Sequence, residues 1–175
     1  MIYLDNAATT YPKPFSVLVT VYRANRKYAY NSGRGGYRES VQTAEKIFAV
    51  RDCLGRFFHC PEQNIVFTNN CTTAVNTALK GLLKPGDHVL ISALEHNAVF
   101  RPIYKLAREG RITFDQVPYH PDPDRFLQNI RALEQPNTAM VAMLHASNVF
   151  GVVHPLGLVG DYCRRKGWLF VVDAA

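Results

Sequence analysis

The chain has 175 residues, 47% of them hydrophobic and 19% charged, which fits one globular domain with an ordinary core. Its net charge of +6 does not indicate nucleic-acid binding, because the 20 lysines and arginines are spread along the chain and no RNA- or DNA-binding motif accompanies them. The first residues include Asp5 and no long apolar run, which is not the pattern of a signal peptide or a membrane helix. We therefore expect a cytoplasmic protein that contacts neither nucleic acid nor membrane.

Residues 1–60 are predicted to form an N-terminal helical segment with loops. A short apolar piece, IYL, leads into the polar stretch DNAATTYPKP. Helices are expected over about 14–29 and 38–58, separated by the loop NSGRGG. Apolar residues recur on one face of the second helix, which predicts a stripe buried in a core. The stripe consists of Ile47, Val50, Leu54, Phe57 and Phe58.

Residues 61–175 alternate short apolar runs with helical patterns. Strands are predicted over 64–68, 88–92, 111–117, 138–144 and 168–172. Helices are predicted over 72–83, 97–109, 124–133 and 155–166. This alternation predicts the α/β fold class, with a mostly parallel, doubly wound sheet built from right-handed βαβ units.

The four cysteines form no C-x-x-C pair and no spacing typical of a zinc module, so reduced thiols are expected. They are Cys53, Cys60, Cys71 and Cys163.

Polar clusters follow several of the predicted strands. In FTNNCTTAVN, Thr72 is a candidate N-cap, and the free N–H groups of that helix start would suit a phosphate as well as a plain capped helix. In SALEHNAVF, His96 precedes a helix and is a candidate general base, metal ligand or ring stacked on an aromatic cofactor. A histidine at such a position is most often a surface cap. A functional role for His96 is supported only because the neighbouring loops are also polar and follow strands at the same edge.

Two further clusters come from the last two strands. Three polar residues follow the end of the strand 138–144, and a simple turn does not require so many of them. They are His145, Ser147 and Asn148. Asp173 follows the apolar run WLFVV, and a carboxylate beside a core requires a cation such as a protonated pyridine nitrogen, Mg²⁺ or an arginine. A phosphate cradle, a stacking histidine, an asparagine and this acid together describe a site for pyridoxal 5′-phosphate (PLP), whose protonated ring is an electron sink.

The motifs YLDNAATT, FTNNCTTAVN, ALEHNAV, HASNVFG and VVDAA resemble, in order and spacing, those of the class V aminotransferase-like PLP enzymes. Within that family they are most similar to cysteine desulfurases and selenocysteine lyases, from residue 2 to residue 175. The stretch NSGRGGYRES is closer to the branch that works with sulfur-assembly scaffolds. The resemblance implies the large domain of PLP fold-type I, conversion of L-cysteine to L-alanine with enzyme-bound sulfur, a homodimer at full length and a sulfur-acceptor protein.

The same resemblance implies roles for single residues. The backbone at Cys71 and Thr72 would bind the PLP phosphate. His96 would stack on the pyridine ring as the catalytic residue of this segment, Asn148 would hydrogen-bond the phenolic oxygen, and Asp173 would pair with the ring nitrogen. Four residues are expected near the substrate entrance: Asn6, Ala7, Ala8 and Arg34.

The sequence also departs from the family pattern. CTT replaces the usual Ala-Thr-Glu or Thr-Thr-Glu, which puts the Cys71 thiol at a helix N-terminus, a position that can lower a thiol pKa. This thiol is not the family's sulfur acceptor, which belongs to a loop further downstream. The Schiff-base lysine and the acceptor cysteine are both expected beyond Ala175, and no lysine here follows the matching motif. We therefore expect 61–175 to be an incomplete PLP-binding domain, inactive as an isolated chain.

Three alternatives remain open. An aminotransferase or epimerase of the same family is not separated from a desulfurase, because the distinguishing residues would lie later. A metal-dependent hydrolase would use Glu95, His96, His145 and Asp173, but H-E-x-x-H or a comparable spacing is absent, so no metal is expected. A dinucleotide-binding domain is disfavoured, because GRGG follows no convincing strand.

Overall fold

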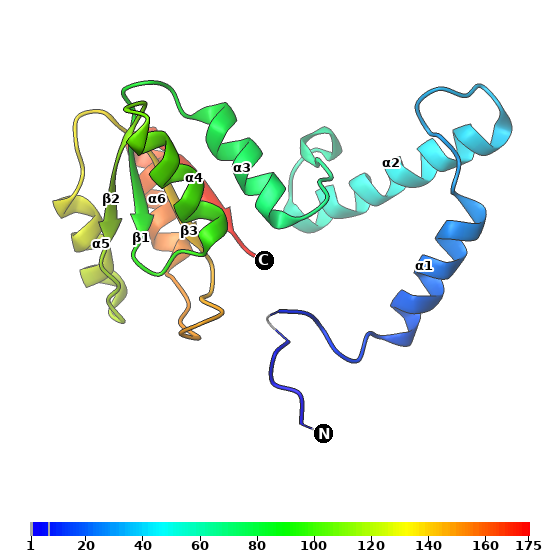
Figure 1. Ribbon diagram of the computed structural model, residues 1–175, viewed down its shortest axis with the longest axis horizontal. Coiled ribbons are helices and arrows are strands. Elements are labelled where there is room, and N and C mark those ends of the chain that lie inside the picture. Colours follow the sequence, from blue (N-terminus) through cyan, green and yellow to red (C-terminus); the bar gives the residue numbers. More distant parts are fainter. Residues whose placement is uncertain (1, 7) are drawn as a thin grey trace. The chain divides into compact units, whose positions relative to one another are not determined.

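The computed structural model describes residues 2–6 and 8–175, so the predicted entrance residue Ala7 lies outside the described residues. The chain divides into two compact units, Met1–Phe67 and Thr68–Ala175. The first unit contains α1 (Phe15–Lys27), α2 (Arg38–Phe58) and the short 3-10 helix η1 (Glu62–Asn64), labelled in part in Figure 1.

The loop between α1 and α2 is held by the first turns of α2. Ser40 is buried, and its hydroxyl lies within hydrogen-bond distance of the carbonyl oxygens of Asn31 (2.7 Å) and Gly35 (2.8 Å). At the other end, α2 stops at His59, which adopts the left-handed conformation with φ 52° and donates its N–H to Arg56. The loop that contains Arg34 therefore has a defined anchor within its own unit.

The apolar stripe predicted on α2 is not a buried core in this structure. Phe57 is 74% exposed and Phe58 62% exposed, Ile47 and Val50 are also exposed, and Leu54 is half-buried. An amphipathic period shows which face of a helix is apolar, but burial requires a second layer against that face. Two helices and one 3-10 turn do not supply that layer within this unit.

The predicted strand 64–68 is wrong. Asn64 is the last residue of η1, and residues 65–68 pair with no strand in the part of the chain that the structure describes. Val66 and Phe67 are exposed. A strand requires a neighbour for its backbone N–H and C=O groups, and an apolar run by itself does not provide one.

The second unit is an α/β fold with a parallel four-stranded sheet in the order β2-β1-β3-β4. The strands are β1 (His88–Ser92), β2 (Thr113–Val117), β3 (Thr138–Leu144) and β4 (Leu169–Asp173). The helices are α3 (Cys71–Leu82), α4 (Asn97–Arg108), α5 (Pro123–Ala132) and α6 (Leu156–Lys166). The predicted fold class, a parallel, doubly wound α/β sheet, is therefore confirmed.

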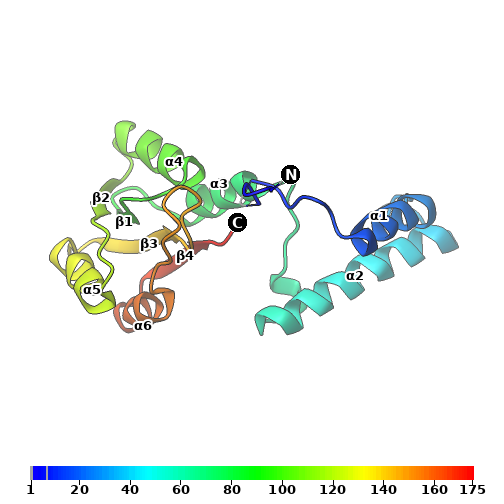
Figure 2. The ribbon, with the colours of Figure 1, turned by 90° about the horizontal axis from the view of Figure 1, so that it is seen from below.

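Helices cover both faces of this sheet, with α3 and α4 on one side and α5 and α6 on the other (Figure 2). Val89 and Ile91 pack into the α3–α4 core, whereas Leu90 between them packs into the α5–α6 core. All three are fully buried, and each such side chain contributes about 1.5–3 kcal/mol to folding. Burial on both faces explains why β1 and β3 read as continuous apolar runs.

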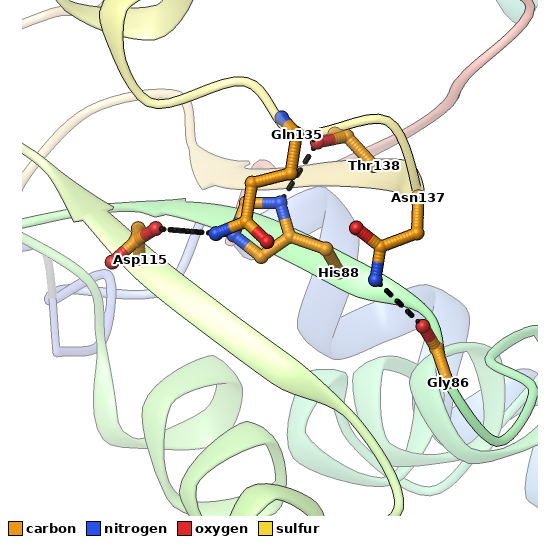
Figure 3. Close-up of polar contacts among 6 residues, drawn as sticks. All are labelled: Gly86, His88, Asp115, Gln135, Asn137 and Thr138. Atoms are coloured by element: carbon orange, nitrogen blue, oxygen red, sulfur yellow. Dashed lines mark hydrogen bonds and ion pairs between the residues drawn. The ribbon is translucent and has the colours of Figure 1, made fainter.

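The amino ends of the strands carry a buried polar network (Figure 3). His88 is buried, with Nδ1 2.8 Å from Thr138 Oγ1 and Nε2 3.2 Å from Asp115 Oδ2. Gln135 donates its backbone N–H to Thr138 Oγ1 and its side-chain amide to Asp115. Burial lowers the pKa of His88, although Asp115 partly opposes this, and a neutral ring satisfies both contacts. The network joins β1, β2 and β3 at the edge opposite their carboxyl ends.

Candidate functional site

Two predicted site residues that are far apart in sequence meet at the carboxyl edge of the sheet. Asp173 ends β4 and is only 7% exposed. Its Oδ1 lies 3.2 Å from the Sγ atom of Cys71, the first residue of α3, and also accepts a hydrogen bond from the Ala175 N–H at 3.1 Å. The end of the last strand and the start of the first helix of this unit are therefore in direct contact.

The helix N-terminus does not lower the pKa of Cys71. Burial raises the pKa of this thiol to about 11, and the hydrogen bond to Asp173 and the charge of that acid add to the shift. The helix N-terminus favours a thiolate, but here desolvation and a neighbouring carboxylate outweigh it. At neutral pH Cys71 is a protonated thiol that donates to Asp173, which is unsuited to nucleophilic attack.

The start of α3 is capped by Asn70 and not by Thr72 as predicted. Asn70 Oδ1 accepts from the Thr73 N–H at 2.8 Å, so Thr72 lies inside the helix. Asparagine caps helices at least as well as threonine does, and the polar stretch from Thr68 to Thr73 offers several starting points. The cap leaves the N–H groups of Cys71 and Thr72 without a hydrogen-bond partner among the described residues. Two free donors at a helix start are suited to an anion.

His96 lies between β1 and α4. Its Nδ1 accepts a hydrogen bond from the Ala98 N–H at 3.1 Å, so the side chain caps α4, and the residue is exposed. The capping interpretation of this histidine is therefore confirmed. An exposed ring at the carboxyl edge remains available for a second role, and its stacking on a cofactor stays a prediction.

The loop after β3 brings the third cluster to the same edge. The His145 N–H donates to the Asp173 carbonyl oxygen at 2.7 Å, which continues the pairing of β3 with β4. Ser147 is buried, and its Oγ accepts from the Phe150 N–H at 3.2 Å, so it holds the turn on which the exposed Asn148 lies. Asn148 thus follows the strand that is hydrogen-bonded to the Asp173 strand.

Glu95 also lies at this edge, and it is half-buried. The sequence pattern suggested only a metal-binding role for this acid. Glu95 Oε1 accepts from the Ser92 hydroxyl at 2.6 Å and from the Leu144 N–H at 2.9 Å. Burial raises the pKa of Glu95 to about 7, which these two hydrogen bonds oppose only in part. The sequence shows only that an acid follows an apolar strand by three residues. Its hydrogen bond to Leu144 on β3 could not be predicted, because the two residues are 49 positions apart.

The remaining predicted residues belong to the unit Met1–Phe67. Asn6 is exposed, and its Oδ1 accepts from the Tyr11 N–H at 3.2 Å. Ala8 and Arg34 are also exposed. The role of these residues at a substrate entrance stays a prediction.

The structure gives no support to the metal-hydrolase alternative. Within residues 2–6 and 8–175, no three His, Cys, Asp or Glu side chains form a group that could hold a metal ion. The set Glu95, His96, His145 and Asp173 therefore does not form a metal centre there. In the same described part of the chain, no helix combines the length and the apolar character needed to cross a membrane.

Known proteins resemble this chain over its whole length. The family model described as aminotransferase class-V matches residues 2–175. The cysteine desulfurase IscS of Shewanella sp. (strain MR-4) is 30% identical over 99% of this chain and 44% of its own length. A probable cysteine desulfurase of Halalkalibacterium halodurans is 28% identical over 100% of this chain and 44% of its own.

A solved structure agrees with these relatives. The apo structure of cysteine desulfurase from Thermococcus onnurineus NA1 superimposes with a TM-score of 0.86 at 28% identity, covering 99% of this chain and 44% of that one. The chain therefore spans 44% of the length of these relatives. With the family model matching nearly every residue, the conclusion is that the chain belongs to the aminotransferase class-V family.

Proposed function

We propose that the unit Thr68–Ala175 binds PLP at the carboxyl edge of its sheet, as part of a cysteine desulfurase-like enzyme that converts L-cysteine to L-alanine and enzyme-bound sulfur. The observation that carries the proposal is the contact between Asp173 and Cys71. It brings a buried acid next to a helix start that has two free N–H donors. The desulfurases among the relatives favour this reaction over transamination or epimerisation.

The charges at this edge fit the two ends of PLP. The free N–H groups of Cys71 and Thr72 suit the phosphate, and the Thr72 hydroxyl adds a donor. Asp173 suits the protonated pyridine nitrogen, since a buried carboxylate requires a cationic partner. When bound, PLP supplies an electron sink for a carbanion. His96 would then cover the ring, and the Asn148 amide would donate to its phenolic oxygen.

Cys71 holds Asp173 and does not accept sulfur. Its thiol is protonated at neutral pH because its pKa is about 11, and it points its hydrogen at the carboxylate. The sulfur acceptor and the lysine that binds PLP covalently are proposed to lie outside the 175 residues. The full-length enzyme is proposed to be a homodimer that passes sulfur to an acceptor protein. The four free cysteines fit a reducing compartment, and we propose a cytoplasmic location.

The proposal predicts binding without turnover for the 175-residue chain. The binding probe is 4-deoxypyridoxine 5′-phosphate, which lacks the aldehyde and therefore cannot react with surface lysines. Calorimetry is expected to give one site with a dissociation constant between about 1 µM and 1 mM. With PLP and L-cysteine, alanine formation is expected to stay at the rate that PLP gives alone.

Two outcomes would contradict this proposal. Absence of binding by the probe up to millimolar concentration would remove the PLP site. Alanine formation well above the background, together with borohydride trapping of PLP on one specific lysine, would show that the chain is catalytically complete. Labelling spread over many exposed lysines is the expected background. The probe without its phosphate group is the matched control and is expected to bind at least tenfold more weakly.

A further inference from the structure

Glu95 lies at the point where the direction of winding changes. β1 and β3 are neighbours in the sheet, but β1 is followed by α4 on one face, and β3 by α6 on the other. The carboxyl ends of these two strands are therefore a topological switch point, which is where open α/β sheets bind ligands. Glu95 Oε1 accepts from Ser92, the last residue of β1, and from Leu144, the last residue of β3. One carboxyl thus joins the ends of the two strands.

The same carboxyl connects the segments that carry two proposed cofactor residues. Leu144 is the register partner of Asp173 in the pairing of β3 with β4. Glu95 also directly precedes His96, so its position fixes where the loop to α4 leaves the sheet. A shift of the Glu95 side chain would move the His96 backbone relative to the end of β3.

The second oxygen of Glu95 has no partner. Oε2 is buried and makes no hydrogen bond within the described part of the chain. A charged carboxylate with an unpartnered buried oxygen is costly, whereas a protonated carboxyl is tolerated much better. Asp173 is the charged group that acts on Glu95 and raises its pKa further, while the neighbouring Cys71 thiol is neutral at this pH. His96 and His145 are the titratable groups on the adjoining loops, and both are exposed.

On the basis of the proposed function, we propose that Glu95 is a positioning residue of the PLP site: as a neutral acid it ties the end of β1 to the end of β3 and leaves Asp173 as the ionised acid for the ring nitrogen. Because its pKa is about 7, Glu95 changes charge in the physiological range. Above that pH the hydrogen bonds to Oε1 are individually stronger, but the buried Oε2 becomes charged without a partner and a second carboxylate forms beside Asp173. This cost favours a Glu95 side chain that turns toward water and away from Ser92 and Leu144. Cofactor affinity therefore depends on the fraction of the chain that carries neutral Glu95.

The test compares Glu95→Gln and Glu95→Ala in the 175-residue chain, with 4-deoxypyridoxine 5′-phosphate as the probe. Gln keeps the oxygen that accepts from Ser92 and Leu144 and cannot ionise. Its affinity is expected to match that of the wild type at pH 6 and to be about tenfold higher at pH 8, since a group of pKa about 7 is then about nine-tenths ionised. Ala leaves the Leu144 N–H without an acceptor and is expected to bind about tenfold more weakly at both pH values.

Comparison at each pH cancels the titration of the probe itself. The exposed variant Glu109→Gln is the matched control and is expected to bind like the wild type at pH 6 and pH 8. A Gln variant as weak as the Ala variant at pH 6, or a ratio to wild type that does not change between pH 6 and pH 8, would overturn the assignment.

A measurement without cofactor separates this inference from the proposed function. The side-chain carboxyl ¹³C resonance of Asp173 is expected to show a step near pH 7 in the wild type and none in Glu95→Gln, because the two acids interact. If that step is present and the probe does not bind, the PLP proposal fails while the acid pair stands. If the probe binds and the step is absent, the role of Glu95 fails while the PLP proposal stands.

Discussion

Replacing Asp173 with alanine is expected to weaken the binding of 4-deoxypyridoxine 5′-phosphate by about 30-fold or more. Asp173 is 7% exposed, so in the complex its carboxylate and the protonated pyridine nitrogen would form a buried, hydrogen-bonded charge pair. Removing one partner of such a pair costs about 2–5 kcal/mol, and each 1.4 kcal/mol is a factor of ten in affinity. Isothermal calorimetry at pH 6.5 on the wild type and the variant measures the change.

Two further variants separate the charge of Asp173 from its shape. Asp173→Asn keeps an oxygen that can accept from Cys71 and from the Ala175 N–H, and it should lose most of the same affinity because it lacks the charge. Asp161→Ala removes an exposed acid from α6 and is expected to leave binding unchanged. Wild-type affinity in the Asn variant would show that Asp173 does not face a cationic ring.

Replacing His88 with leucine is expected to lower the free energy of unfolding by about 2–3 kcal/mol at pH 7. The change removes both contacts of a fully buried ring and leaves the buried Thr138 hydroxyl with only the Gln135 N–H as a partner, while the half-exposed Asp115 can turn to water. Leucine fills most of the space, so little of the loss comes from a cavity. Urea denaturation followed by circular dichroism measures it, and Gln116→Leu on the exposed side of β2 should change stability by no more than about 0.5 kcal/mol.

The stability lost in the His88→Leu variant should also depend on pH. The pKa of His88 in the folded chain lies below the usual value of 6.5. As the pH falls below 6.5, His88 therefore becomes protonated in the unfolded chain while it stays neutral in the folded chain. The stability that His88 contributes is therefore present above pH 6.5 and is lost as the pH falls through the folded pKa. The gap between wild type and His88→Leu should narrow between pH 7 and pH 5. Burial also lowers the pKa of His154, but it does so in both proteins and cancels in the difference. A gap that widens toward pH 5 would show that His88 is charged in the fold.

The second unit could be predicted well because its signals are local. The runs HVLIS and TAMVAML gave β1 and β3 at their observed bounds, since strands buried on both faces need apolar residues at every position. Glycine and proline stops such as KPGD and EGR marked the turns between elements. The strand order β2-β1-β3-β4 was not predicted, although it is compatible with right-handed connections that place helices on both faces.

The errors share one cause, which is that neighbours in space are not visible in a sequence pattern. The run 64–68 has strand composition but no partner strand, and the apolar stripe of α2 has no covering layer in its own unit. The N-cap of α3 is Asn70, whose backbone is extended and whose side chain accepts from the Thr73 N–H, whereas Thr72 lies inside the helix. The direction of the Cys71 pKa depends on Asp173, 102 residues away.

The candidate site was predictable as a set of motifs but not as an arrangement. Asp173, His96 and Asn148 were found because each follows a strand, and parallel strands end at one edge. The contact between Cys71 and Asp173, and the position of Glu95 between the ends of β1 and β3, depend on strand order and register. Those two features define the charge of the site, and only the fold reveals them.

Amide chemical-shift mapping of the ¹⁵N-labelled chain tests most directly whether the loops at the carboxyl edge hold a phosphorylated pyridine. On addition of 4-deoxypyridoxine 5′-phosphate, the largest shifts are expected at the amides of Cys71, Thr72, His96 and Asn148, with little change around His88 at the opposite edge. The Cys71 and Thr72 shifts should be lost when the probe lacks its phosphate. Shifts centred on His88 and Thr138, or spread evenly over surface lysines, would contradict a PLP site at this edge.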